Sequence, residues 1–232
     1  MEQANLETWK TALMGETLIF GMLGKILYAE PDKGWLGDLI REEVFADVPF
    51  GGGQAEARNG ISLLRTWSDK YQNGVPEDEF AALKKDYLYL FIGAGNVLAP
   101  VWESVYFNEG RLLFQKETLE VREWYARFGL QAERKGREPD DHIGLELSFL
   151  AHLATLALNS LEAGDEAAAQ KNLQAQRDFL TQHLLRWAPA WAELVEKHAG
   201  TDFYRGLSHL TLGALLAAAE LLEIEMPKEK VN

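Results

Sequence analysis

The sequence predicts an all-α protein, a helical bundle of roughly nine to eleven helices. Three observations lead to this fold class. Apolar residues recur at helical spacing along most of the chain, no series of alternating strands is found, and prolines and glycines end the periodic segments at lengths typical of helices. With 232 residues, of which 47% are hydrophobic and 25% charged, the chain can bury a substantial core.

The N-terminal helices carry start and stop signals. Pro31 ends the first helix, and Asn73-Gly74 ends the third. Pro76 opens the fourth helix, and the acids of residues 77–79 occupy its first turn, where the positive end of the helix dipole favours negative charge. These signals fix the helix boundaries more firmly than the apolar pattern does alone.

The C-terminal half is marked in the same way. Gly164 ends one helix, and Asp165 caps the next, which is expected to reach Trp187. Pro189 then begins a short helix that stops at Gly200. Together, the expected helices cover residues 6–29, 36–45, 54–71, 76–91, 116–129, 141–162, 165–187, 189–200 and 202–225.

Two segments interrupt the helical pattern. The stretch from Ile92 to Arg111 mixes glycines and a proline with aromatic residues, and an irregular segment of this length in a compact domain is often functional. A charged linker follows at residues 131–137. We expect a single helical domain over residues 1–232. The linker is compatible with a hinge near residues 131–140 between two subdomains, and equally with a surface loop.

Charge and composition narrow the range of partners. The net charge is −13 and the longest basic run is the pair Lys84-Lys85, so no nucleic-acid partner is expected. An acidic surface favours a cationic ligand or peptide, although it also serves solubility alone. The chain has no cysteine, its first residues lack the features of a signal peptide, and its longest nearly apolar run, residues 210–219, is too short for a bilayer. We expect a cytoplasmic protein without a membrane span.

The stretch from Glu138 to Leu150 carries the most information. A polar turn marked by proline opens onto an apolar helix, and one histidine lies among four carboxylates. A helix start needs one capping residue, and Asp140 or Asp141 can accept hydrogen bonds from its free N–H groups. His142 and Glu146 are four residues apart and share a helix face that becomes apolar further along. Such a face can hold a peptide with a cationic group beside an apolar segment, and it is equally compatible with a histidine that bonds a neighbouring group above a core.

The sequence supports a catalytic or metal site less well than a peptide-binding face. His142 and Glu146 can begin a metal site, but the chain has only five histidines and no second His-x-x-x-Glu or His-x-x-x-His pair. Ser104 lies beside Glu103, yet the Gly-x-Ser-x-Gly nucleophile elbow is missing. We expect no catalytic activity and no metal. The alternatives are a nucleotide- or metal-dependent hydrolase using His142 and Glu146, and an adaptor that holds a folded partner through the aromatic stretch around Trp102.

Two ordered segments carry a family resemblance. The first reads Tyr-Leu-Phe-Ile-Gly-Ala-Gly over residues 89–95 and Pro-Val-Trp-Glu-Ser-Val-Tyr over residues 100–106. The second reads Glu-Pro-Asp-Asp-His-Ile-Gly-Leu-Glu-Leu-Ser-Phe over residues 138–149, and a weaker similarity follows over residues 183–189 and 203–204. With these segments the chain resembles the TorD/DmsD family of cytoplasmic chaperones, also called redox enzyme maturation proteins, whose second motif is close to E-x-P-x-D-H-[ILF]-x-x-E-[LF]. The N-terminal third matches only in its helical character.

The resemblance implies a TorD-like helical fold around a groove. It also implies a chaperone that binds the twin-arginine signal peptide of a molybdenum-containing oxidoreductase and delays export until the molybdopterin cofactor is inserted and the enzyme has folded. Members of the family have been linked to GTP, but this chain has no phosphate loop and acids crowd the helix start that would hold a phosphate, so no cofactor is expected. Some relatives exchange helices, so a monomer or a helix-swapped dimer is expected. The family pattern assigns peptide binding to Trp102, Glu103, Ser104, Tyr106, Pro139, Asp141, His142 and Glu146.

Overall fold

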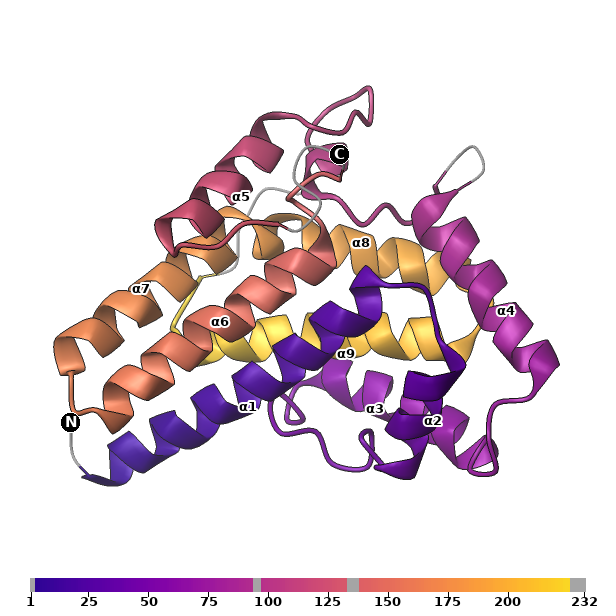
Figure 1. The fold of residues 1–232 in the computed structure, drawn as a ribbon, viewed down its shortest axis with the longest axis horizontal. Helices are drawn as coiled ribbons and strands as arrows, with labels where there is room; N and C mark the ends of the chain where they lie inside the picture. The colour runs from indigo at the N-terminus through magenta and orange to yellow at the C-terminus, as the bar shows by residue number, and fades with distance from the viewer. Residues whose placement is uncertain (1–2, 94–96, 133–137, 226–232) are drawn as a thin grey trace. The chain divides into compact units, whose positions relative to one another are not determined.

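The computed structural model describes residues 3–93, 97–132 and 138–225. Its described part contains nine α-helices, a π-helical turn and a 3₁₀ turn, and no β-strand (Figure 1). The predicted all-α class is therefore confirmed. The chain forms two compact units: unit 1 holds the residues up to Tyr28, Trp102–Trp187 and those from Ala218 onward, and unit 2 holds Ala29–Val101 and Ala188–Ala217.

The boundary between the units differs from the hinge suggested by the sequence. The chain crosses between the units after residues 28, 101, 187 and 217, whereas the described part of residues 131–140 lies within unit 1. Residues 133–137 of the suggested hinge lie outside the described residues. The expectation of a single domain over the whole chain stays a prediction.

Unit 1 is built around two long antiparallel helices, α1 (Gln3–Tyr28) and α6 (Ile143–Glu162), which run side by side (Figure 1). Their closest approach requires glycine, because a Cβ added to Gly144 would lie 2.7 Å from the Gly24 carbonyl oxygen and 2.9 Å from the Tyr28 nitrogen. At the other end of the pair, Leu13 packs into a cluster of small and branched residues of α6. The glycine contact brings the end of α1 against the start of α6, where the second sequence motif lies.

Helix α6 is long and apolar enough to cross a bilayer by length and composition alone. Eleven of its residues are buried within the protein, which is typical of the central helix of a globular core. Helices α5 (Lys116–Arg127) and α7 (Glu166–Gln182) also belong to unit 1. They contribute to an aromatic core with α6, formed by Trp124, Tyr125, Phe128, Phe149 and Phe179.

Unit 2 contains α2 (Lys33–Arg41), α3 (Ala55–Lys70), α4 (Glu77–Tyr87), the π-helical turn Leu88–Ile92 and most of α9 (Asp202–Leu221). The Asp32 carboxylate caps α2 by accepting N–H bonds from Gly34 and Trp35 at 2.8 and 3.2 Å. Glycines again bring two helices together, because a Cβ on Gly213 of α9 would lie 2.3 Å from the Ala57 nitrogen of α3. The core of this unit is rich in aromatic rings, namely Trp67, Tyr71, Tyr87, Phe91, Trp191, Phe203 and Tyr204.

The prediction of one helix over residues 165–187 is wrong, because this segment belongs to two helices. Helix α7 ends at Gln182, and His183 leaves the helical conformation with φ −123° and ψ −97°. Helix α8 then runs over Leu184–His198 with Pro189 inside it, whereas the sequence predicted that Pro189 would begin a helix. The side chain of His183 is bound to a buried glutamate, and this tertiary contact is absent from a local reading of the sequence.

Candidate functional site

The two sequence motifs meet in unit 1 through the carboxylate of Asp141. The backbone N–H of Ser104 donates to Asp141 Oδ2 at 2.7 Å, and the Thr118 hydroxyl donates to Oδ1 at 2.7 Å. The Glu103 N–H also donates to the Asp141 carbonyl at 2.9 Å. We call this set of bonds the Asp141 latch. It joins the 3₁₀ turn Glu103–Tyr106, the first turn of α5 and the segment that leads into α6.

His142, and not an aspartate, caps α6. Its Nδ1 accepts the Gly144 N–H at 3.0 Å. Burial lowers the pKa of His142 to about 3, so the ring is neutral near pH 7. Because Nδ1 accepts a hydrogen bond, the single ring proton lies on Nε2. The ring also makes edge contacts with Tyr28 and Trp102, with centroids 5.2 and 5.7 Å apart.

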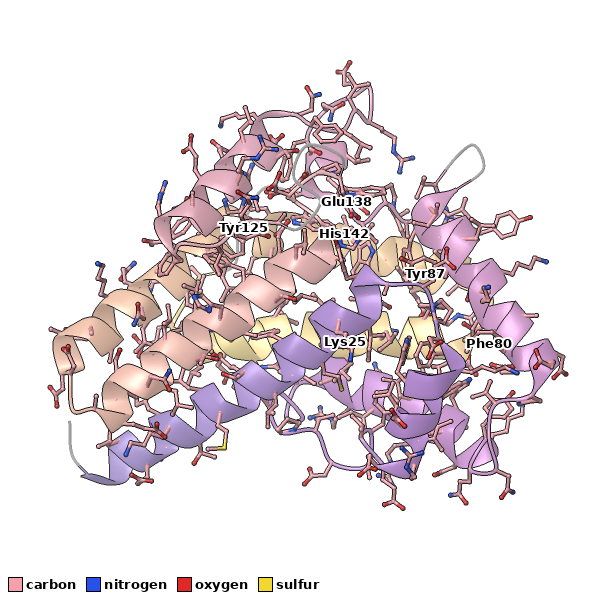
Figure 2. The ribbon with its side chains drawn as sticks, viewed as in Figure 1. Lys25, Phe80, Tyr87, Tyr125, Glu138 and His142 are labelled. Atoms are coloured by element: carbon pink, nitrogen blue, oxygen red, sulfur yellow. The ribbon has the colours of Figure 1, made fainter. Side chains whose placement is uncertain are left out.

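The expected aspartate cap is wrong because both candidates have other partners. Asp141 forms the latch, and Asp140 accepts two bonds from the Arg122 guanidinium, at 2.6 and 3.0 Å. The Tyr125 hydroxyl donates to the Asp140 carbonyl at 3.1 Å. These bonds hold α5 against the start of α6. On the other side, the Tyr28 hydroxyl donates to Glu138 at 3.1 Å, and Glu138 and His142 lie close together at this end of α6 (Figure 2).

Two further glutamates are buried at the same end of α6. Glu103 Oε2 lies 2.8 Å from Nδ1 of His183, and both side chains are buried. Glu146 is fully buried and neither carboxylate oxygen has a hydrogen-bond partner among the described residues. Burial, followed by the nearby charges of Glu103 and Asp141, raises the pKa of Glu146 well above its usual value. The Trp187 indole opposes this rise in pKa, although its Nε1 does not reach hydrogen-bonding geometry.

Burial also raises the pKa of Glu103, against the opposing effect of His183. Buried polar groups in native proteins are normally hydrogen-bonded, and exceptions cluster at functional sites or at sites of strain. Here a group of polar atoms around Glu146 lacks partners within the described residues. Its members are Glu103 Oε1, Ser104 Oγ, both oxygens of Glu146, His183 Nε2 and Trp187 Nε1.

A surface groove of about 430 Å³ lies between α5 and the junction of α7 with α8. His183 lines this groove and also contacts the buried Glu103, so it connects the surface with the buried cluster. The lining is of mixed charge, since Lys116 is paired with Glu120 at 3.0 Å and Arg127 lies over the Trp124 ring at 4.6 Å.

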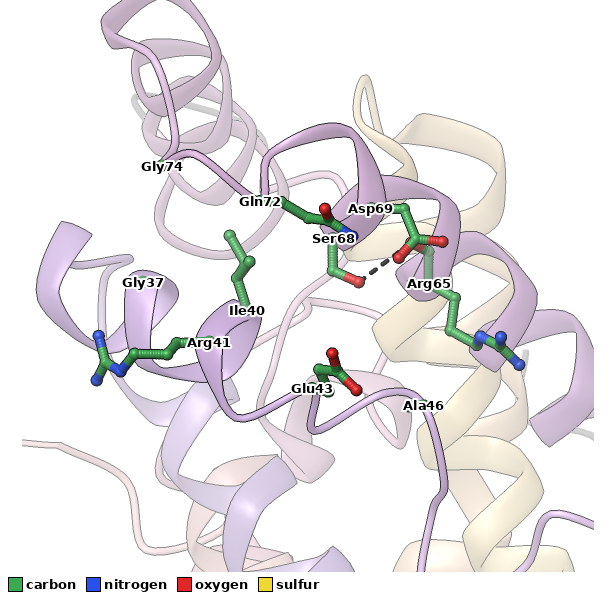
Figure 3. A pocket seen from close by; sticks show the side chains of 10 residues that line it. All are labelled: Gly37, Ile40, Arg41, Glu43, Ala46, Arg65, Ser68, Asp69, Gln72 and Gly74. Atoms are coloured by element: carbon green, nitrogen blue, oxygen red, sulfur yellow. Dashed lines mark hydrogen bonds between the residues drawn. The ribbon is translucent and has the colours of Figure 1, made fainter.

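A second cavity, of about 530 Å³, lies in unit 2 among α2, α3 and the turns that follow them (Figure 3). Its lining includes Arg41, Glu43, Arg65 and Asp69. The Ser68 hydroxyl on this lining donates to the Arg65 carbonyl at 3.1 Å. None of the residues that the sequence assigned to peptide binding lines this cavity.

The structure gathers the predicted residues in unit 1 but buries most of them. Trp102 and Tyr106 are partly exposed, and Tyr106 packs on Trp187 with ring centroids 5.1 Å apart. The sequence proposed Asp141, His142 and Glu146 as the polar end of a peptide-binding groove, and the structure buries all three side chains. Their assignment to peptide binding stays a prediction. The buried members are Glu103, Ser104, Pro139, Asp141, His142 and Glu146.

Several residues of this site were missed by the sequence reasoning. Thr118 and Arg122 lie inside an ordinary amphipathic helix, and nothing in their spacing indicates that they face Asp141 and Asp140. His183 and Trp187 lie in the segment with the weaker family similarity, which was the one available signal. Among the described residues, no group of three or more histidine, aspartate and glutamate side chains is placed to hold a metal ion.

Comparison with known proteins gives consistent matches. The model of a family described as "Nitrate reductase delta subunit" matches residues 54–193, which include both motifs. The chaperone protein TorD of Vibrio cholerae serotype O1 is 36% identical over 157 residues, which cover 68% of this chain and 67% of that protein. The Tat proofreading chaperone DmsD of Salmonella typhi is 32% identical and covers 82% of this chain and 81% of its own length. The probable Tat proofreading chaperone DmsD of Haemophilus influenzae is 27% identical over 210 residues, or 90% of this chain and 93% of that protein.

Proposed function

Because this chain belongs to the TorD/DmsD family of redox enzyme maturation chaperones, we propose that it binds the twin-arginine signal peptide of a molybdenum-containing oxidoreductase precursor. Binding takes place in the cytoplasm and delays export until the cofactor is inserted and the enzyme has folded. The relatives directly support a chaperone role in redox enzyme maturation. The peptide ligand, the molybdenum client and the compartment are the proposal.

The observation that carries the proposal is the Asp141 latch. Two motifs separated by more than thirty residues in the sequence are joined by the Ser104 N–H bond to the buried Asp141 carboxylate at 2.7 Å and by the Glu103 N–H bond to the Asp141 carbonyl at 2.9 Å, and Thr118 on α5 binds the second carboxylate oxygen. A bond network of this kind fixes the 3₁₀ turn and the loop behind it. It therefore suits a preorganised binding surface, in which rigid support lowers the entropic cost of capturing a flexible peptide.

Electrostatics support a cationic ligand. The chain carries a net charge of −13, and a leader with two adjacent arginines is drawn to such a protein. A guanidinium bound to a partly buried carboxylate contributes about 1.5–3 kcal/mol per charge-assisted hydrogen bond, whereas an exposed pair contributes under about 1 kcal/mol. Strong weakening of binding by salt would therefore indicate that the arginines bind at the surface.

The hydrolase alternative has no support from the relatives, which are named as chaperones. We propose that peptide binding requires neither a metal nor GTP. Binding that is unchanged after dialysis against EDTA and after addition of GTP is the expected outcome. A dependence on either would overturn this part of the proposal.

Isothermal titration with a synthetic twin-arginine leader tests the function. The leader is taken from a molybdoenzyme encoded in the same genome, and a second peptide carries two lysines in place of the arginines. We expect the arginine peptide to bind at least about tenfold more tightly, a difference of about 1.4 kcal/mol, because guanidinium groups make paired hydrogen bonds that ammonium groups cannot. Absence of binding to every such leader would disprove the function.

The site assignment needs a control for stability. Asp141→Asn weakens the latch in unit 1. Asp86→Asn weakens the bonds of a second buried aspartate, which holds backbone N–H groups in unit 2. We expect the first variant to lose at least about tenfold in peptide affinity and the second to bind like the parent at a temperature where both are folded. Equal affinities of the two variants would refute the assignment of the site to the latch.

A further inference from the structure

A run of three exposed apolar residues follows the 3₁₀ turn. The side chains of Leu112, Leu113 and Phe114 are 57%, 37% and 48% exposed. Single exposed leucines are common on protein surfaces, but consecutive exposed apolar residues carry a solubility cost and usually mark a contact surface. We refer to residues 112–114 as the apolar loop.

Hydrogen bonds hold the apolar loop in one conformation. The Leu112 N–H donates to Asn108 Oδ1 at 2.7 Å, and the Asn108 amide donates back to the Leu112 carbonyl at 3.1 Å. The Gln115 amide donates to the Leu113 carbonyl at 2.8 Å. These bonds use the backbone polar groups of the loop and leave its apolar side chains on the surface.

Unfavourable backbone angles occur at Arg111, directly before the apolar loop, and at Phe114 within it. Arg111 has φ 49° and Phe114 has φ 58°, and a bulky residue in the left-handed region costs on the order of 1 kcal/mol or more. A loop that only connects two helices could relieve this strain with glycine at either position. A conformation that combines strain with exposed apolar side chains is therefore more consistent with recognition than with folding.

The apolar loop is connected directly to the Asp141 latch. The Asn108 amide that holds Leu112 also donates to the Ser104 carbonyl at 2.6 Å, and the Ser104 N–H donates to Asp141. The residues that the family pattern assigns to peptide binding thus fix the position of this exposed surface. This connection also explains how buried residues can affect the binding of a peptide that they do not touch.

We infer that the apolar loop binds the apolar segment of the client's leader peptide, the segment that follows the arginines. This inference rests on the proposed function and adds the surface and the part of the ligand that it recognises. The charges near the loop balance, because Lys116 is paired with Glu120 and the carboxylates of Glu109 and Glu117 are matched in number by the guanidinium groups of Arg111 and of Arg186, which lies over the Phe107 ring at 4.2 Å. The attraction for the arginines of the leader comes from the whole chain, whose net charge is −13, while the adjoining apolar segment covers the loop.

The test uses two synthetic peptides of equal length. Both carry two adjacent arginines, followed in one by roughly twelve apolar residues, a length typical of a signal-peptide core, and in the other by serine and glycine. We expect the parent protein to bind the apolar peptide at least about tenfold more tightly than the serine peptide. In the variant Leu112→Ser, Leu113→Ser, Phe114→Ser this preference is expected to disappear, while the weak affinity for the serine peptide is kept.

Leu18→Ser provides a matched control, because Leu18 on α1 is 57% exposed, as Leu112 is. This variant should keep the full preference for the apolar peptide. Asn108→Ala leaves the apolar side chains in place but releases the loop, and we expect it to weaken binding of the apolar peptide by roughly threefold to tenfold through lost preorganisation.

Several outcomes would overturn the inference. If the parent and the triple variant prefer the apolar peptide equally, the loop is not the docking surface, although the proposed function stands. If the parent binds neither peptide, the function and the inference both fail. If the loop instead drives binding to vesicles of phosphatidylglycerol and phosphatidylcholine, or self-association seen by light scattering, with no discrimination between peptides, the loop has a different partner.

Discussion

The starts of α6 in unit 1 and α9 in unit 2 are both held by buried aspartates, but they differ in what else is buried there. At α9, Asp86 accepts from the Gly200 and Thr201 N–H groups at 2.9 Å and from the Thr201 hydroxyl at 2.6 Å, and both of its oxygens are used. At α6, both oxygens of Asp141 are also used, yet Glu103, Glu146 and Asp140 bury carboxylate oxygens that have no hydrogen-bond partner among the described residues. One carboxylate is therefore enough to hold a helix start, and a buried carboxylate oxygen without a hydrogen-bond partner costs stability. Among the described residues Glu146 bonds through neither oxygen, so its cost is not offset by a structural contact and is best explained by function.

The largest expected effect comes from removing either aspartate. Asp141→Ala leaves the Ser104 N–H and the Thr118 hydroxyl without a buried acceptor, and Asp86→Ala does the same to Gly200 and Thr201. Each unsatisfied buried donor costs about 1–3 kcal/mol. We expect both variants to lose about 3–5 kcal/mol of unfolding free energy, measured by urea denaturation at pH 7. If the loss at Asp141 is below about 1 kcal/mol, the latch does not stabilise the two motifs.

Glu146→Gln tests the additional carboxylate at α6. The folded-state pKa of Glu146 is raised, so its contribution to stability is complete below the unfolded value of 4.5 and is lost as the pH rises toward the folded pKa. This loss amounts to about 1.4 kcal/mol per pH unit. Glutamine is a neutral isostere. We expect the variant to match the parent within about 1 kcal/mol at pH 4.5 and to become progressively more stable than the parent as the pH rises toward the folded pKa.

Glu16 in α1 provides the reference for this experiment. It is a buried carboxylate whose one hydrogen-bond partner within the described part of the chain is the Gln176 amide, which donates at 2.6 Å. Burial raises the pKa of Glu16 to about 7. The parent should therefore lose about 3 kcal/mol of unfolding free energy through Glu16 between pH 4.5 and 7, and Glu16→Gln should abolish this loss. A pH profile of Glu146→Gln that runs parallel to that of the parent would show that Glu146 is charged in the folded protein and would remove the main difference between the two helix starts.

The sequence predicted the helices well because periodicity, prolines and capping residues are local signals. The acidic first turn of α4 and the Asp165 cap of α7 both occur as expected, the latter with Asp165 accepting the Ala168 N–H at 2.9 Å. The division of residues 165–198 into two helices at His183 was not predictable in this way, because it depends on a contact with Glu103, eighty residues earlier in the chain.

The sequence predicted that two segments of the candidate site lie together, but it did not predict the geometry of the site. The sequence grouped Asp141, His142 and Glu146 and associated them with the Trp102 segment, and the structure brings these segments together. The inward orientation of the side chains follows from partners on α5 that show no motif, chiefly Thr118 and Arg122. The apolar loop was missed because its exposure depends on the Asn108 hydrogen bonds, and a Leu-Leu-Phe run in isolation predicts burial.

The smallest expected effect, and the most specific to α6, concerns its cap. His142→Asn keeps a capping acceptor but loses ring contacts with Tyr28 and Trp102, so we expect a cost of about 1–2 kcal/mol at pH 7.5. Because the folded-state pKa of His142 is lowered to about 3 from 6.5, the stability that the neutral ring provides is complete above pH 6.5 and is lost as the pH falls. The parent loses about 1.4 kcal/mol per pH unit there, and asparagine does not titrate. Urea denaturation at pH 7.5, 6 and 5 should show that the difference in unfolding free energy between the parent and the variant disappears by about pH 5. A difference that stays constant over this range would mean that His142 can be protonated in the folded protein and that the start of α6 is more open than its burial implies.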